Sequence, residues 1–329
     1  MAWKKLKLVV NGAEIDAIAP TIISASRSTD IPAFHSEWFI NRLRAGYVKW
    51  VNPFNRKEQY ISFGATKFIV FWTKNAAPLM RYLPEIDRLG IAYYFNYTIN
   101  DYEKEGLEPN LPPLTERINT FRKLSDIIGK ERVIWRFDPL ILTNDISPES
   151  LALKIDGIGN KVFTHTDRLV FSYVDIDCYQ HVRRNLLNRG ISYIPIDDAS
   201  MISIALKIQE LNRKWRLTLA TCSEEITLNS LGIEHNKCID GNLIRKIGGI
   251  CSDVLKCNNL QLPMFTKHLS KDDDVKDLGQ RKLCQCVESK DIGQYNSCGH
   301  LCVYCYANYS PSIVKNNLRR ANVDSDSIL

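Results

Sequence analysis

The strongest constraint on the fold is a repeated alternation between short apolar segments and longer amphipathic ones. The apolar runs predict six buried strands, at Thr21–Ser26, Lys67–Thr73, Ile91–Ile99, Arg132–Phe137, Arg168–Val174 and Trp215–Ala220. The segments between them predict helices, at His35–Gly46, Pro78–Leu89, Leu114–Ile128, Ser147–Val162 and Ser200–Asn212. Strands that are apolar throughout and separated by helices are typical of parallel β/α units whose sheet is covered on both faces. We therefore expect an α/β fold, a complete or partial TIM-type barrel, with a doubly wound open sheet as the alternative.

No glycine-rich phosphate loop follows any predicted strand, which argues against a nucleotide-binding Rossmann domain. The first residues, up to Val10, predict an edge strand or hairpin, and Tyr47–Phe63 predicts extended chain around a turn at Pro53–Asn55. We find no long linker. The expectation is one domain over residues 1–329, in which residues 222–329 contribute a cysteine-rich region.

The composition is that of an ordinary globular protein, with 45% hydrophobic and 24% charged residues. No apolar run approaches the ~18 residues of a membrane-spanning helix. Asn11, Glu14 and Asp16 interrupt the only N-terminal run that could be the apolar core of a signal peptide. A cytoplasmic protein without membrane contact is expected. The net charge of +6 is compatible with a nucleic-acid partner but has little weight alone.

The chain has ten cysteines, and eight of them lie between Cys238 and Cys305. In a reducing compartment, clustered cysteines more often bind metal or carry out redox chemistry than form disulfides. Cys178 stands apart from the others and is expected to be a buried apolar residue.

Three cysteines form a compact motif of the type C-x₃-C-x₂-C, namely Cys298, Cys302 and Cys305. Thiolates are soft ligands that suit iron–sulfur clusters or zinc. Three of them would hold three irons of a four-iron cluster and leave the fourth iron open to another ligand. The alternative is a zinc site with His300 as fourth ligand, although His300 lies inside the first loop, where it would strain to share one tetrahedron with the flanking cysteines.

A second set of cysteines predicts a further iron–sulfur cluster: Cys222, Cys238, Cys284 and Cys286. Cys284 and Cys286 form a tight C-x-C pair, but the set as a whole has no diagnostic spacing. Cys251 and Cys257 are not assigned to either predicted cluster.

Polar residues gather just after several of the predicted strands, where a barrel carries its chemistry. The candidates for a substrate and cofactor cavity are Arg27, Asp30, Lys74, Asn75, Arg136 and Asp138, with Cys222, Glu224 and Glu225 after the sixth strand. Asp30 precedes Ile31–Pro32 and fits a helix cap equally well.

The cysteine motif, followed by an aromatic residue, resembles the signature of the radical S-adenosylmethionine superfamily. The wider segment from Tyr295 to Ala307 is similar to the branch that contains spore photoproduct lyase. Over essentially the whole chain, the sequence also resembles a bacterial family of unknown function that ends with this motif. The segments that carry this resemblance are Ser24–Phe34, Phe71–Asn75, Val133–Pro139 and Gln280–Cys286. Leu301 stands where such sequences commonly have glycine.

The superfamily resemblance implies a [4Fe-4S] cluster whose open iron binds S-adenosylmethionine, with Tyr304 near the adenine and Lys74 or Arg136 on the methionyl carboxylate. It also implies reductive cleavage to a 5′-deoxyadenosyl radical, hydrogen abstraction from a substrate, and a reductase or a flavodoxin- or ferredoxin-type electron donor. The alternatives are an electron-transfer or redox-sensing protein and a zinc-stapled nucleic-acid-binding module. In the superfamily the cysteine loop usually follows the first strand. Here the matching strand would be Asp291–Tyr295, so a circularly permuted barrel is expected.

Overall fold

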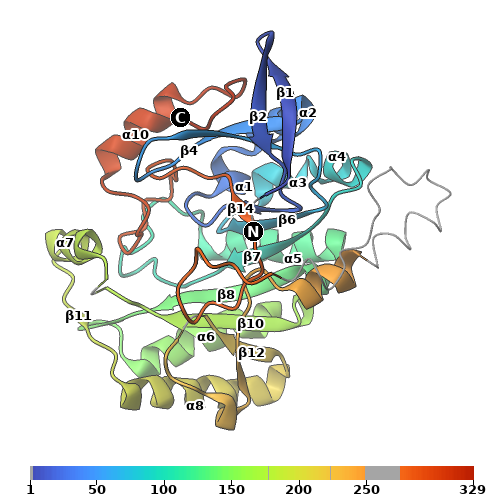
Figure 1. The fold of residues 1–329 in the computed structure, drawn as a ribbon. Coiled ribbons are helices and arrows are strands. Elements are labelled where there is room, and N and C mark those ends of the chain that lie inside the picture. The colour runs from blue at the N-terminus through green and yellow to red at the C-terminus, as the bar shows by residue number, and fades with distance from the viewer. Residues whose placement is uncertain (1–2, 177, 223, 249–274) are drawn as a thin grey trace.

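The computed structural model describes residues 3–176, 178–222, 224–248 and 275–329 (Figure 1). Cys251 and Cys257, which the sequence analysis left uncommitted, lie outside these described residues.

An eight-stranded sheet forms the centre of the molecule. Its strands, from one edge to the other, are β13 (Ile233–His235), β12 (Thr218–Thr221), β10 (Arg168–Tyr173), β8 (Val133–Leu140), β7 (Ala92–Thr98), β6 (Phe68–Thr73), β3 (Ile22–Ala25) and β14 (Lys290–Asp291). Every neighbouring pair is parallel. In the described residues the edge strands β13 and β14 do not pair with each other, so the fold is a mixed α/β fold with a large parallel sheet whose strands do not close into a barrel.

The last strand of the chain lies beside the first strand of this sheet. Lys290 and Asp291 of β14 pair in parallel with Ile23 and Ser24 of β3. The Asp291 carboxylate accepts hydrogen bonds from Ser24 Oγ at 2.5 Å, from Ser26 Oγ at 2.7 Å and from the Arg27 amide at 2.8 Å. It also accepts from the Gly293 amide, which turns the chain out of the sheet. The strand predicted at Asp291–Tyr295 therefore begins and ends earlier than expected.

The two faces of the sheet are covered differently. On one face Ile69, Phe71, Tyr93, Phe95 and Trp135 belong to the main core. Alternate residues of the same strands, such as Val70 and Tyr94, point to the other face, because side chains alternate along a strand. There they pack against residues 238–247 and 284–287, a group that includes three cysteines. The second face is thus covered by the cysteine-bearing segments.

The helices mostly follow the predicted segments. They are α1 (Ile31–Phe34), α2 (Ser36–Ala45), α3 (Ala77–Met80), α4 (Leu83–Arg88), α5 (Leu114–Ile128), α6 (Pro148–Val162), α7 (Gln180–Asn188), α8 (Asp198–Trp215) and α10 (Pro311–Arg320), and residues 241–248 are helical too. Ser147, Asp197 and Ser310 cap α6, α8 and α10 with side-chain oxygens, as their residue types favour. Gly46 ends α2 in the left-handed conformation, with φ of 79°.

Three predicted boundaries are wrong. The helix expected at Pro78–Leu89 is two short helices, because Pro84 lies in the first turn of α4, where it lacks the amide that a continuous helix would need. Trp215 ends α8 rather than starting a strand, and Arg216 follows in the left-handed conformation, with φ of 56°. Strand β8 continues past Phe137 to Leu140, so that Arg136 and Asp138 lie within it.

Two smaller sheets complete the described structure. The first has the order β1 (Lys5–Val10), β2 (Ala13–Ile18), β5 (Glu58–Ser62) and β4 (Tyr47–Val51), which confirms the predicted N-terminal hairpin. The second pairs β9 (Leu142–Thr143) with β11 (Tyr193–Ile194). Among the described residues, no helix is both long and apolar enough to span a membrane.

Candidate functional site

The cysteine motif follows β14 directly and forms a loop whose backbone is held by side chains from elsewhere. Asn308 Nδ2 donates to the Cys298 carbonyl and Asn110 Nδ2 donates to the Gly299 carbonyl, each at 2.9 Å. A Cβ added at Gly299 would lie 2.5 Å from the Phe34 ring, so only glycine fits at this point of the motif. The loop is therefore fixed against α1 and against the segment that precedes α5.

The three thiols of the motif are close enough to one another for their charges to interact. Cys302 interacts electrostatically with both Cys298 and Cys305, and Cys298 interacts with Cys305. Burial raises the pKa of all three thiols, to about 12 for Cys298. The loop thus places three partly exposed soft donors in the same neighbourhood.

Leu301 has φ of 54°, in the left-handed region. Glycine adopts this conformation at no steric cost, whereas leucine is strained there. A glycine at position 301 would therefore relieve this strain.

The side chain of His300 is engaged with Asp30. His300 Nε2 is hydrogen-bonded to Asp30 Oδ2 at 2.8 Å, and its ring packs edge-on against Phe34. The Asp30 carboxylate also accepts from the amide of Lys74 at 2.7 Å and from that of Ala33, so it caps α1 as well. This arrangement weighs against His300 as the fourth ligand of a zinc site.

A buried polar cluster lies beside the motif. Lys74 Nζ is 2.7 Å from Glu108 Oε1 and 3.1 Å from the Tyr304 hydroxyl, and Tyr304 donates to Glu108. Asn100 Nδ2 lies 3.1 Å from the Tyr304 hydroxyl. Burial alone would raise the pKa of Glu108, but the Lys74 ammonium and the hydrogen bonds outweigh it, and the net shift is downward. Lys74 is therefore already paired with a carboxylate.

The sequence analysis missed Glu108 and Asn100. Both lie on the connection between β7 and α5, in a stretch with no periodic pattern. The only available signal was Glu108 itself, one charged residue among several along this connection.

Arg136 links this region to a second group of cysteines. It forms an ion pair with Asp138 at 2.6 Å, and its Nη1 donates to Cys238 Sγ at 3.2 Å. Asp138 in turn accepts a hydrogen bond from Ser172 on the neighbouring strand β10. Both predicted cavity residues of β8 therefore point to the same face of the sheet as Cys238.

All four cysteines of the second predicted set meet at this face. Cys222 Sγ and Cys238 Sγ are 3.2 Å apart, and the Cys286 thiol lies close enough to those of Cys238 and Cys284 to interact with them electrostatically. Hydrogen bonds from the Cys222 and Cys286 thiols, with the nearby Arg136 guanidinium, lower the pKa of Cys238. Tertiary structure thus supplies the proximity that the sequence spacing did not.

The remaining predicted cavity residues differ in their surroundings. Arg27 lies over the Trp72 ring at 5.1 Å and interacts with Asp291, and within the described residues its Nη2 has no hydrogen-bond partner. Asn75 uses its side-chain oxygen to accept from the Ala77 amide at the start of α3, so its role is local. Cys178 was expected to be buried but is exposed, because it lies on the connection that leads from β10 to α7.

In the described part of the chain, no group of three or more His, Cys, Asp or Glu side chains is arranged to hold a metal ion. For the second cysteine group the distances give a reason. Thiolates that share one tetrahedral zinc ion are ~3.8 Å apart, given a zinc–sulfur bond of about 2.3 Å. Cys222 and Cys238 are closer than that, at 3.2 Å.

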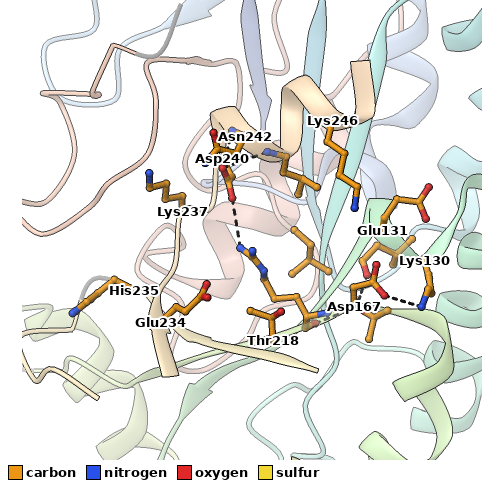
Figure 2. Close-up of a pocket in the computed structure, with 15 residues that line it drawn as sticks. Lys130, Glu131, Asp167, Thr218, Glu234, His235, Lys237, Asp240, Asn242 and Lys246 are labelled. Carbon is orange, nitrogen blue, oxygen red and sulfur yellow. Dashed lines mark hydrogen bonds and ion pairs between the residues drawn. The ribbon is translucent and has the colours of Figure 1, made fainter. Parts of the chain in front are cut away.

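A cavity of about 430 Å³ borders the segment that carries Cys238, because Lys237 and Asp240 are among its lining residues (Figure 2). It is lined by the first residues of β8, β10 and β12, at the opposite end of the strands from the cysteine motif. Arg168 and Asp240 form an ion pair across it at 3.6 Å, and Lys130 pairs with Asp167 at 2.9 Å. No cysteine is among its lining residues, so we do not assign the chemistry of the chain to it.

One comparison identifies relatives of this chain. A family model described as a domain of unknown function, DUF1848, matches residues 22–307. The chain belongs to this family. The matched residues run from the start of β3 to just beyond Cys305, so the DUF1848 match includes the central sheet and both cysteine groups. No curated protein and no solved structure matches the chain.

Proposed function

We propose that this DUF1848 protein is an iron–sulfur enzyme of the radical S-adenosylmethionine type, and that Cys298, Cys302 and Cys305 hold its [4Fe-4S] cluster. The observation that carries the proposal is the position of these three thiols, which interact with one another in a single loop beside the buried polar cluster of Lys74, Glu108 and Tyr304. Three thiolates leave one iron of such a cluster free for a further ligand. An electron carrier would have no need of a polar cluster at that position.

The residues around the loop fit the cluster and its cofactor in kind. The donor set is soft and consists entirely of cysteine sulfur, the usual ligand of iron–sulfur clusters. The Arg27 Nη2 atom is buried without a hydrogen-bond partner in the described structure, and a buried guanidinium suits a carboxylate such as that of a methionyl group. Lys74 and Arg136 are already paired with Glu108 and Asp138, so Arg27 is the better candidate for this contact.

When bound, the cluster and S-adenosylmethionine would supply one-electron cleavage of the sulfonium bond and a 5′-deoxyadenosyl radical for hydrogen abstraction. The protein's own residues would position the cofactor and the substrate. Tyr304 is held by Lys74, Glu108 and Asn100, which keeps its ring next to the motif. A reductase, or a flavodoxin- or ferredoxin-type protein, would donate the electron.

We also propose that the sheet is a partial barrel in a permuted order. The support is the position of β14, which comes last in the chain yet lies beside β3 and leads directly into the cysteine loop. A loop that follows the first strand in related enzymes would then occupy the same place in space.

The test is to replace each motif cysteine with alanine and to purify the proteins anaerobically. Each variant should lose most of the iron and acid-labile sulfide of this cluster and should make no 5′-deoxyadenosine from S-adenosylmethionine under dithionite. Cys178→Ser, at an exposed cysteine away from the motif, is the matched control and should behave like the wild type. Wild-type protein that forms no 5′-deoxyadenosine above a cluster-free control, with a cluster EPR spectrum unchanged by S-adenosylmethionine, would contradict the proposal.

A further inference from the structure

Four buried or partly buried cysteines from three separate segments converge on the second face of the sheet. Cys222 follows β12, Cys238 follows β13, and Cys284 and Cys286 precede β14. Cys222 and Cys238 are in contact at 3.2 Å. Cys284 and Cys286 belong with Cys238 to one buried cluster, and Cys222 packs against that cluster. Cysteine is often buried as a small apolar residue, which explains one such side chain but not four in a single cluster.

Nitrogen donors surround the sulfurs of this group. Arg136 Nη1 and Asn236 Nδ2 donate to Cys238 Sγ at 3.2 and 3.3 Å, and the Ile239 amide donates to Cys286 Sγ at 3.3 Å. Sulfur is a weak acceptor when it is a neutral thiol, whereas N–H donors directed at thiolates are the usual environment of metal-bound cysteines. The surroundings therefore suit charged sulfur.

The electrostatic setting also suits a centre with net negative charge. Four thiolates on one zinc ion or on a four-iron cluster carry a net charge of about −2, which is costly to bury without a cation. Arg136 is buried against Cys238, and the Arg27 guanidinium is buried and interacts electrostatically with Cys238 and Cys286. One guanidinium group thus contacts Cys238, and a second is near enough to Cys238 and Cys286 to interact with them electrostatically.

We propose that Cys222, Cys238, Cys284 and Cys286 form a second metal centre, separate from the C-x₃-C-x₂-C loop and held by four thiolates. This donor set is shared by structural zinc and by iron–sulfur clusters. The sulfurs must move apart to accept either. Cys222 and Cys238 are closer than two thiolates on one zinc ion, and a four-iron cluster, in which each thiolate binds a different iron, needs a wider separation still. Cys222 and Cys238 lie next to loops, and a shift of well under 1 Å brings their 3.2 Å separation to the spacing that zinc needs.

This second centre would be connected to the first cysteine group through hydrogen bonds. Arg136 bonds to the Asp138 carboxylate, the Asp138 amide donates to Asn100, and Asn100 contacts the Tyr304 hydroxyl beside the motif. The centre would therefore hold in place the hydrogen-bonded residues between the two cysteine groups. This role would not depend on radical chemistry at the first loop.

The test starts from the triple variant Cys298→Ala/Cys302→Ala/Cys305→Ala, expressed with iron and zinc supplied and purified anaerobically. Elemental and sulfide analysis should show either about four irons with about four sulfides per chain, which identifies a cluster, or about one zinc. Adding Cys238→Ser or Cys286→Ser should remove that metal. Adding Cys178→Ser should leave it in place.

Should the triple variant fail to fold, the single variants Cys238→Ser and Cys286→Ser in the otherwise intact chain provide the same test. Each should contain less metal than Cys178→Ser, by the amount that one centre binds. A folded triple variant without bound metal would overturn the proposal. So would metal that persists after Cys238→Ser and Cys286→Ser, or a Cys222–Cys238 disulfide in the anaerobic protein. Failure of S-adenosylmethionine cleavage in the wild type would leave this result untouched, so the two proposals fail separately.

Discussion

At the scale of single residues, Lys290 shows how the fold changes the chemistry of a side chain. It lies in β14 with its ammonium 3.5 Å from the centre of the Trp50 ring. Burial lowers its pKa to about 8, against a smaller opposing effect of Asp291. In the unfolded chain the Lys290 side chain would have its ordinary pKa of 10.5 and would stay protonated up to about that pH. Between these two pKa values the unfolded state holds more protons, so stability should rise with pH there.

We predict that Lys290→Met is more stable than the wild type at pH 7, by about 1 to 3 kcal/mol, and that this advantage shrinks as the pH rises from about 8 towards 10. The reason is that methionine carries no charge to bury. In the wild type, the free-energy cost of burying the Lys290 ammonium disappears only when the pH is high enough for Lys290 to lose its proton. Urea unfolding of both proteins at several pH values measures the difference. Lys57→Met, at an exposed lysine, is the control. A gap between Lys290→Met and wild type that widens above pH 8 would refute the assignment.

At the scale of elements, the packing of α6 against α8 depends on one glycine. A Cβ added at Gly159 would lie 2.2 Å from the Trp215 ring, whereas one added at Gly157, in the same helix, would have no heavy atom within 4 Å. Local helix propensity favours alanine at both positions. Only the neighbouring helix distinguishes them.

We expect Gly159→Ala to destabilise the protein by about 1 to 3 kcal/mol, since either the tryptophan or the helix must move. Gly157→Ala should stabilise it by about 0.5 to 1 kcal/mol. Chemical denaturation of the two variants beside the wild type measures both effects with the same residue change. Two variants that shift stability in the same direction and by similar amounts would show that α6 and α8 do not pack as described.

At the scale of the whole molecule, the end of the described chain is packed onto its beginning. The Trp38 indole donates to the Ser325 carbonyl at 2.9 Å, and the Lys49 amide donates to the Asp326 carbonyl at 2.7 Å. Ile328 is buried within the main core. Residues after α10 therefore cover α2 and β4, more than 270 positions earlier in the chain.

Truncation after Arg320 should destabilise the protein by about 2 to 4 kcal/mol, because it removes these hydrogen bonds and the buried Ile328 and leaves the Trp38 indole without a partner. Removal of the exposed Leu329 alone is the control and should have little effect. Urea midpoints and the rate of limited proteolysis near α2 are the measurements. Equal midpoints for both truncations would mean that this packing does not contribute to stability.

The sequence by itself determined the elements whose signals are local. Leu114–Ile128 was predicted to the residue, and the strands at Thr21–Ser26 and Lys67–Thr73 to within two residues, because apolar periodicity, capping side chains and glycine stops act over a few positions. The neighbourhood of Cys298, Cys302 and Cys305 is also determined locally, because residues so close in sequence stay near one another in almost any loop.

Tertiary structure alone decided which distant segments meet. β14 pairs with β3 across more than 260 residues, Cys222 and Cys238 meet the C-x-C pair across more than 45, and Glu108 becomes the buried partner of Lys74. Cys178, which looked like a core residue, ended at the surface. The physical reason is that such contacts are chosen by the burial of apolar surface and the pairing of polar groups over the whole chain, which no local window of sequence contains.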